Sequence, residues 1–218
     1  MEEKSKMKSI LEWIYCIIIA LVIVLIIKSF LGVPTVVKQS SMYPTLTENE
    51  RLWLNKWGTT FHQMPKRGDI ITVEAPTKEW FMNPNHADLD NPVAVYRYNP
   101  DNVFTKFVYY TLEIGKTSYI KRVIGLPGEH VQIKDGAVYI NDEKLEEKYL
   151  RDYVVTTEEG EYLDIIVPEG TVYVLGDNRG DSIDSRRFGC IPLEKIEGKA
   201  VFSFWPLNKF GGIYKDVR

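Results

Sequence analysis

Two side chains in this sequence have the type and setting for chemistry: a serine just beyond a long apolar stretch, and a lysine inside an apolar run. Ser41 opens residues 41–46 (SMYPTL), and Lys121 lies within residues 119–128 (YIKRVIGLPG). A serine hydroxyl is a weak nucleophile until a neighbouring base removes its proton. Because burial disfavours a charged amine and lowers its pKa, a lysine within an apolar strand can serve as that base.

Histidine is the usual base for a serine nucleophile, but the sequence favours lysine here. The histidines are His62, His86 and His130, and none has neighbours typical of a catalytic site. Taken alone, Ser41 is more typical of a turn before a proline, and Lys121 of an exposed strand charge. The chemical hypothesis therefore depends on further motifs.

The element that must position Ser41 is the apolar stretch before it. Residues 13–27 carry no charge, and the apolar run extends to the ~20 residues that a spanning helix needs. A buried core helix is the alternative, but apolar residues around the whole circumference of the helix favour a lipid environment. Residues 28–34 (KSFLGVP) offer no Ala-x-Ala-like cleavage site, so an uncleaved anchor over residues 10–33 is predicted rather than a removed signal.

Charge sets the expected orientation of this anchor. Lys4, Lys6 and Lys8 precede the span, which predicts a short cytoplasmic tail over residues 1–9 and an extracytoplasmic domain over residues 34–218. The bias is modest, because Lys28 and Lys38 follow the span.

Composition limits the class of the exported part. The chain has 218 residues, 26% charged and 44% hydrophobic, which is typical of a globular protein. A formal net charge of −3 gives no reason to expect nucleic acid as a partner. Cys16 lies in the span and Cys190 far along the chain, so no disulfide within the chain is expected.

Short apolar runs separated by glycine and proline predict a mostly β domain. Asp135-Gly136 predicts a hairpin turn. The segment 74–118 has the least clear secondary-structure pattern and is either an inserted subdomain or a long excursion around the sheet. For most of five aromatic residues, Trp53, Trp57, Trp80, Phe81 and Trp205, core packing is favoured over contact with a bilayer. Strands are predicted at residues 70–73, 131–133, 137–140, 165–167, 171–175 and 200–204.

Four segments, in order and behind an anchor, resemble the type I signal peptidases, which are membrane-bound Ser/Lys proteases that remove signal peptides from exported proteins. The single span is similar to that of the shorter enzymes of Gram-positive bacteria. The segments are 41–46 (SMYPTL), 67–71 (RGDII), 119–125 (YIKRVIG) and 176–189 (GDNRGDSIDSRRFG).

The resemblance implies a mostly β, signal-peptidase-like catalytic domain that needs no cofactor and cuts secretory preproteins after small residues of Ala-x-Ala type. It implies that Ser41 is the nucleophile and Lys121 the general base. Ser182 would hydrogen-bond to the lysine amine and orient it, and Asp184 with Arg186 would form a supporting ion pair. Membrane lipid would surround the anchor.

The oxyanion hole is the point where the sequence departs from the family pattern. Gln39 stands where some members place a serine whose hydroxyl helps to form the hole. The backbone N–H of Ser41 is therefore the expected donor, with the Gln39 amide as a second candidate.

Other functions have weaker support. Asp177, Asp181 and Asp184 offer oxygen ligands of the kind that calcium binds, but the nearby arginines favour ion pairing and no metal is expected. A self-cleaving repressor-like protease is disfavoured by the anchor. A penicillin-interacting enzyme needs Ser-x-x-Lys, whereas Tyr43-Pro44 follows here. A membrane-anchored scaffold on a dead protease fold has no need to keep Ser41 and Lys121.

Overall fold

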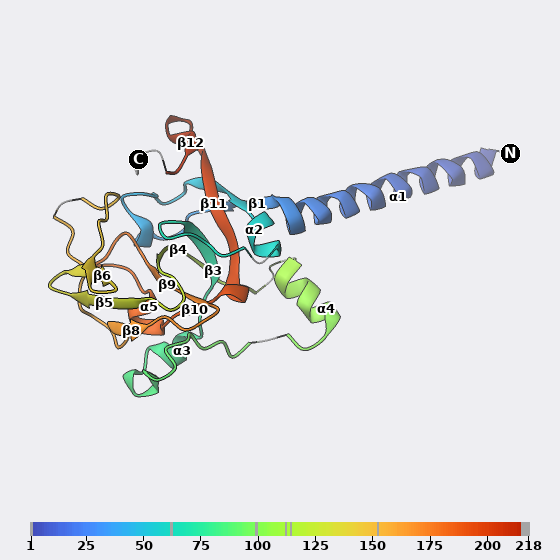
Figure 1. Cartoon of the computed structure of the whole chain (residues 1–218). Helices are drawn as coiled ribbons and strands as arrows, with labels where there is room; N and C mark the ends of the chain where they lie inside the picture. The colour runs from blue at the N-terminus through green and yellow to red at the C-terminus, as the bar shows by residue number, and fades with distance from the viewer. Residues whose placement is uncertain are drawn as a thin grey trace.

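A computed structural model of the chain describes residues 2–61, 63–98, 100–111, 113, 115–151 and 153–214. One long helix, α1 (Glu2–Ile26), projects from a domain built of strands and continues into a π-helical turn, η1 (Ile27–Leu31) (Figure 1). The window Ser9–Ile26 has a mean hydropathy of 2.7, and none of it is buried against protein. A helix this apolar and this uncovered needs an apolar medium around it.

Two antiparallel sheets make up the domain. The larger has the order β1-β2-β11-β3-β4-β9-β10, with β12 paired to β11, and the smaller has the order β7-β6-β5-β8. The strands of the larger sheet are β1 (Gly32–Val36), β2 (Arg51–Asn55), β3 (Ile70–Glu74), β4 (Ser118–Gly125), β9 (Thr171–Leu175), β10 (Ile191–Pro192), β11 (Ile196–Trp205) and β12 (Gly211–Gly212). Those of the smaller sheet are β5 (His130–Lys134), β6 (Ala137–Ile140), β7 (Glu143–Lys144) and β8 (Asp164–Ile166).

The prediction of a mostly β domain is confirmed, and each of the six predicted strands coincides with an observed one. The predicted hairpin is present between β5 and β6, where Asp135 and Gly136 have φ values of 52° and 71°. Strands β1 and β2 were not predicted, although they flank the Ser41 segment. β1 begins at Gly32, where the predicted anchor still continued, because residues 32–36 pair with β2.

Three apolar clusters hold the sheets together. The first lies between the small sheet and the β4–β9 pair, the second covers the region around β3, β9 and the helix α5 (Ser185–Phe188), and the third fills the space under the Ser41 segment. Met42 and Leu46, which follow Ser41, are fully buried in the third cluster. The turn that carries the serine is thus fixed by its own apolar side chains.

Short helices fill the connections. They are η2 (Ser40–Met42), α2 (Trp57–Thr60), α3 (Lys78–Phe81), η3 (Pro84–His86), α4 (Val103–Lys106), η4 (Phe107–Thr111), α5 (Ser185–Phe188), η5 (Leu193–Lys195) and η6 (Leu207–Lys209).

The segment 74–118 connects the neighbouring strands β3 and β4. Its Phe81 and Ala94 pack into the second cluster, so the excursion shares the core of the sheet. Phe81 meets the expectation of core packing. Trp57 and Trp205 do not, since each is 49% exposed.

Candidate active site

Lys121 lies in the middle of the larger sheet. Its strand, β4, runs between β3 and β9, and Lys121 is opposite Ile71 of β3. A strand covered on both faces is a near-continuous apolar run, and β4 is fully buried from Lys121 to Gly125. The lysine side chain is therefore 1% exposed.

Ser41 comes to this lysine from a distant part of the sequence. It lies in η2, within the connection between β1 and β2, and η2 packs against β4. The Lys121 Nζ and the Ser41 Oγ are 2.8 Å apart, within hydrogen-bond distance. The fold thus brings together a nucleophile and an amine that are 80 residues apart in the sequence.

The electrostatic surroundings favour the neutral amine. Burial lowers the pKa of Lys121 from 10.5 to about 8, with Asp184 acting against the shift and Arg186 adding to it. Desolvation penalises the charged form of any buried amine, and here it outweighs the nearby carboxylates. A large fraction of this lysine can accept a proton under mildly alkaline conditions.

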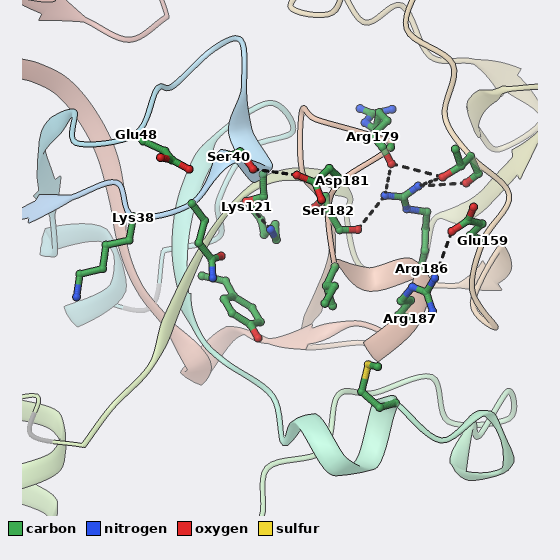
Figure 2. Close-up of a pocket in the computed structure, with 17 residues that line it drawn as sticks. Lys38, Ser40, Glu48, Lys121, Glu159, Arg179, Asp181, Ser182, Arg186 and Arg187 are labelled. Carbon is green, nitrogen blue, oxygen red and sulfur yellow. Dashed lines mark hydrogen bonds and ion pairs between the residues drawn. The ribbon is translucent and has the colours of Figure 1, made fainter.

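The 176–184 loop holds the serine segment in place. The Asn178 N–H donates to the Ser41 carbonyl at 3.0 Å, and its side-chain amide donates to the Ser40 carbonyl at 3.2 Å. The Ser40 hydroxyl donates to Asp181 Oδ2 at 2.9 Å (Figure 2). A Cβ on Gly176 would lie 2.5 Å from the Ser41 carbonyl oxygen, so only glycine allows this close approach.

Ser182 lines the same cavity but does not make the predicted hydrogen bond. Its hydroxyl oxygen is buried and has no hydrogen-bond partner among the described residues. The expectation that Ser182 pairs with the lysine amine is thus not met in this structure, because Lys121 Nζ is directed to Ser41 Oγ instead. A supporting role for Ser182 stays a prediction.

Asp184 and Arg186 lie beside the site as a buried pair. Arg186 Nε donates to Asp184 Oδ1 at 2.8 Å and its Nη2 donates to Oδ2 at 2.9 Å, which makes the ion pair bidentate. Arg186 also donates to the carbonyls of Arg179 and Ser182, so it fixes the loop that faces Lys121 (Figure 2). Gln39, the candidate amide donor, lines the cavity next to Ser41.

A second buried ion pair was missed by the sequence reasoning. Arg122, the neighbour of Lys121, donates to Asp177 through Nε at 2.8 Å and Nη2 at 2.6 Å, and both side chains are fully buried. The Thr45 hydroxyl donates to the same carboxylate at 2.5 Å, and the Tyr149 ring lies 3.8 Å from the guanidinium. The signal in the sequence was Arg122 itself, because an arginine directly after the candidate base in an apolar strand indicates a buried ion pair.

The other chemically capable residues lie elsewhere or are occupied. His86 stacks on Trp80 and His130 pairs with Asp164, and neither lines the cavity at Ser41; His62 lies outside the described residues. The three carboxylates considered for calcium are engaged by Arg122, Ser40 and Arg186. Among the residues that the structure describes, no group of three or more His, Cys, Asp or Glu is arranged to hold a metal ion.

A cavity of about 570 Å³ opens over the serine and the lysine. Its walls come from the serine segment, from Tyr119 of β4, from the 176–184 loop and from α5, and it carries several charged side chains (Figure 2). A polypeptide could enter such an open, partly polar depression and present a carbonyl group to Ser41 Oγ.

Comparison with known proteins places this geometry in a family. The model of the family described as signal peptidase, peptidase S26, matches residues 10–205. The chain belongs to the signal peptidase family. It is 35% identical to signal peptidase I T of Bacillus subtilis over 213 residues, which covers 94% of this chain and 91% of that protein.

A further relative agrees with this assignment. Signal peptidase I of Leptolyngbya laminosa is 36% identical over 205 residues, covering 93% of this chain and 83% of that protein. A crystal structure of a signal peptidase I from Enterococcus faecalis V583 is 29% identical, with a TM-score of 0.38 and coverage of 62% of this chain and 96% of that one. The apolar helix and the family together make this a single-pass membrane serine endopeptidase whose catalytic domain is extracytoplasmic.

The buried pair beside the dyad yields a stability prediction. Asp177→Asn leaves the Arg122 guanidinium buried without a counter-ion, which costs about 3–5 kcal/mol. We expect Tm of the detergent-solubilised protein to fall by roughly 10 °C. The matched control is Asp181→Asn, which removes an exposed carboxylate of the same loop and should change Tm little. Equal Tm values for the two variants would contradict this account.

Proposed function

We propose that this signal peptidase cleaves preproteins with Ser41 as nucleophile and Lys121 as general base. The observation that carries the proposal is the 2.8 Å contact between Lys121 Nζ and Ser41 Oγ, made by a lysine that is 1% exposed. A dyad needs both a short contact and a base that is neutral near the working pH, and the short distance and the lowered pKa of Lys121 support this assignment.

The reaction would proceed by acyl transfer. Neutral Lys121 takes the proton of the Ser41 hydroxyl as Oγ attacks the scissile carbonyl carbon. The protonated lysine then gives its proton to the leaving amine nitrogen as the C–N bond breaks, which leaves an ester on Ser41. Lysine next takes a proton from water, the hydroxide attacks the ester, and the proton returns to Ser41 Oγ as the signal peptide is released with a free carboxyl group.

The developing oxyanion requires donors aimed at it. We assign the backbone N–H of Ser41 as one donor, because the first N–H groups of a helix such as η2 have no partner within that helix. The Gln39 amide is the second candidate, on the ground that Gln39 directly precedes the same short helix and lines the cavity. Asp184 and Arg186 would support the site by fixing the Ser182 loop.

Two adjoining hollows support the proposed specificity for small residues. A second hollow of about 280 Å³ adjoins the first across Gln39 and Ser41, and its walls include Val37, Met42 and Ile120. We propose that this hollow and the adjacent part of the cavity receive the small side chains before the cut, giving cleavage after Ala-x-Ala.

Tethering would bring enzyme and substrate together. We propose a cytoplasmic tail over residues 1–9 and a lipid-embedded anchor from residue 10 that ends at Leu31, where the extracytoplasmic domain begins with β1. Eight residues lie between Gly32 and Ser41 in the sequence, so the extended chain reaches at most about 30 Å. A signal peptide held in the same bilayer then meets the dyad at high effective concentration.

The dyad is tested by removing each partner. We expect Ser41→Ala and Lys121→Met to lower kcat for a preprotein with an Ala-x-Ala site by about 10³-fold or more, because neither partner substitutes for the other. Lys148→Met removes a surface lysine and serves as the control. Cleavage is measured on the detergent-solubilised full chain, with the new N-terminus read by mass spectrometry. Full activity in either dyad variant would exclude the assignment, whereas no cleavage by the folded parent chain would favour a scaffold.

The pH profile tests the state of the lysine. Since the base must be neutral, kcat/KM should rise with pH and level off above the Lys121 pKa of about 8. The Asp181 carboxylate raises this pKa, so Asp181→Asn should move the midpoint to lower pH. Glu159→Gln, in the same cavity, should move it less. An acidic optimum would be incompatible with a lysine base.

Ser182 is tested as a positioning residue. Its buried hydroxyl has no partner among the described residues, and we propose that it turns to the lysine amine during catalysis. Loss of one hydrogen bond of roughly 1 kcal/mol predicts that Ser182→Ala lowers kcat about fivefold with KM unchanged. Ser182→Thr keeps the hydroxyl and should restore much of the rate. Unchanged kinetics and an unchanged pH midpoint in Ser182→Ala would remove it from the site.

A further inference from the structure

One helical segment of the 74–118 excursion turns its apolar side away from the protein. Helix α4 continues directly into η4, and on this segment Val103 is 86% exposed, Phe104 73% and Phe107 40%. A surface helix of a globular domain normally directs such side chains into the core. The outer face of α4–η4, defined by these three residues, therefore needs another apolar phase to cover it.

Contacts on the opposite side hold the segment in this orientation. The Tyr109 hydroxyl donates to Glu74 Oε1 at 3.1 Å, and the Tyr109 ring lies 4.7 Å from that of Tyr98. Glu74 is itself 3% exposed and pairs with Lys195 at 3.2 Å, so the attachment point is part of the domain interior. The start of the helix is closed by a capping box. The apolar residues cannot roll inward without breaking these contacts.

Ion pairs place the end of this segment beside the membrane anchor. Glu113, two residues beyond η4, pairs with Lys56 at 3.0 Å and with Lys28 at 3.9 Å. Lys28 follows the apolar window by two residues, which is about 3 Å along a helix axis. A lysine at this position reaches the lipid headgroups, so Glu113 lies at the headgroup level. Figure 1 shows α4 on the side of the domain from which α1 leaves.

A second group of exposed apolar residues lies on the same side. Trp57 is 49% exposed and Phe61 52%, and their rings are 4.6 Å apart. They belong to α2 and its C-terminal end, and α2 contacts η1 at the foot of the anchor. Tryptophan and other aromatic residues are enriched at membrane–water interfaces. Exposed Lys106, on α4 itself, adds a cation that suits anionic headgroups.

We propose that the outer face of α4–η4, together with Trp57 and Phe61, is a membrane-contact surface that lies in the interface of the bilayer spanned by α1. The occupant is the lipid surface itself, because the surface continues the established membrane anchor through Lys28 and Glu113. A single helix leaves a domain free to rotate about its axis. A second contact restricts that rotation and fixes the height and direction of the Ser41 cavity.

The test measures how close this surface lies to lipid in the full chain. The chain, carrying Cys16→Ser, is reconstituted into phosphatidylcholine–phosphatidylglycerol vesicles with Val103→Cys labelled by bimane; Cys190 is 0% exposed and does not compete for the label. Lipids with a nitroxide near the headgroup end of the acyl chain quench the dye. The control is Ile166→Cys. Ile166 is 66% exposed, and its strand, β8, lies away from α1 in Figure 1. Phe104→Cys is a second labelling site if Val103→Cys does not fold.

We expect several-fold stronger quenching at position 103 than at position 166. Equal, weak quenching at both positions would overturn the proposal. Disulfide cross-linking between two copies through position 103 would also overturn it, because a second copy would then cover the surface. The same quenching is expected when Ser41→Ala is added, since the contact with lipid does not depend on cleavage. Failure of the dyad assignment is thus distinguishable from failure of this inference.

Discussion

The amine of Lys121 has to stay uncharged close to a serine hydroxyl, and this is possible only where water is kept away. Burial is the largest influence on its pKa, and it is opposed by carboxylates that the loop needs for its own structure. Asp184 is neutralised by Arg186, while Asp177 is neutralised by Arg122. These buried ion pairs let the 176–184 loop approach the lysine without restoring its charge. The catalytic proposal depends on that balance.

The same constraint explains the position of the serine. A nucleophile on a flexible loop would not keep a 2.8 Å contact with a side chain buried in the sheet. Met42 and Leu46 fix the serine segment by packing into the third apolar cluster, and the Asn178 N–H holds its backbone through a hydrogen bond to the Ser41 carbonyl. The site is therefore assembled from a strand and two loops that the core fixes against each other, which is a rigid arrangement for acyl transfer.

The candidate catalytic pair and the proposed membrane-contact surface lie in different parts of the region that the family model matches. The matched region extends from the anchor to Trp205 and includes Ser41 and Lys121. The outer face of α4–η4 lies in the excursion between β3 and β4, and it bears on how the domain sits on the bilayer rather than on the chemistry. The second contact would complement the tether, because a substrate held in the membrane approaches from one direction only.

The sequence by itself determined the anchor, the mostly β class and the strands with clear turns such as Asp135-Gly136, and it singled out Ser41 and Lys121 as the candidate catalytic pair, because these depend on local pattern and on ordered motifs. Tertiary structure decided the rest. The 2.8 Å contact, the partner of Asp177 and the unpartnered Ser182 hydroxyl each depend on side chains from distant segments. The outward direction of Phe104 was equally hidden, since an apolar residue in a sequence does not show whether core or lipid will cover it.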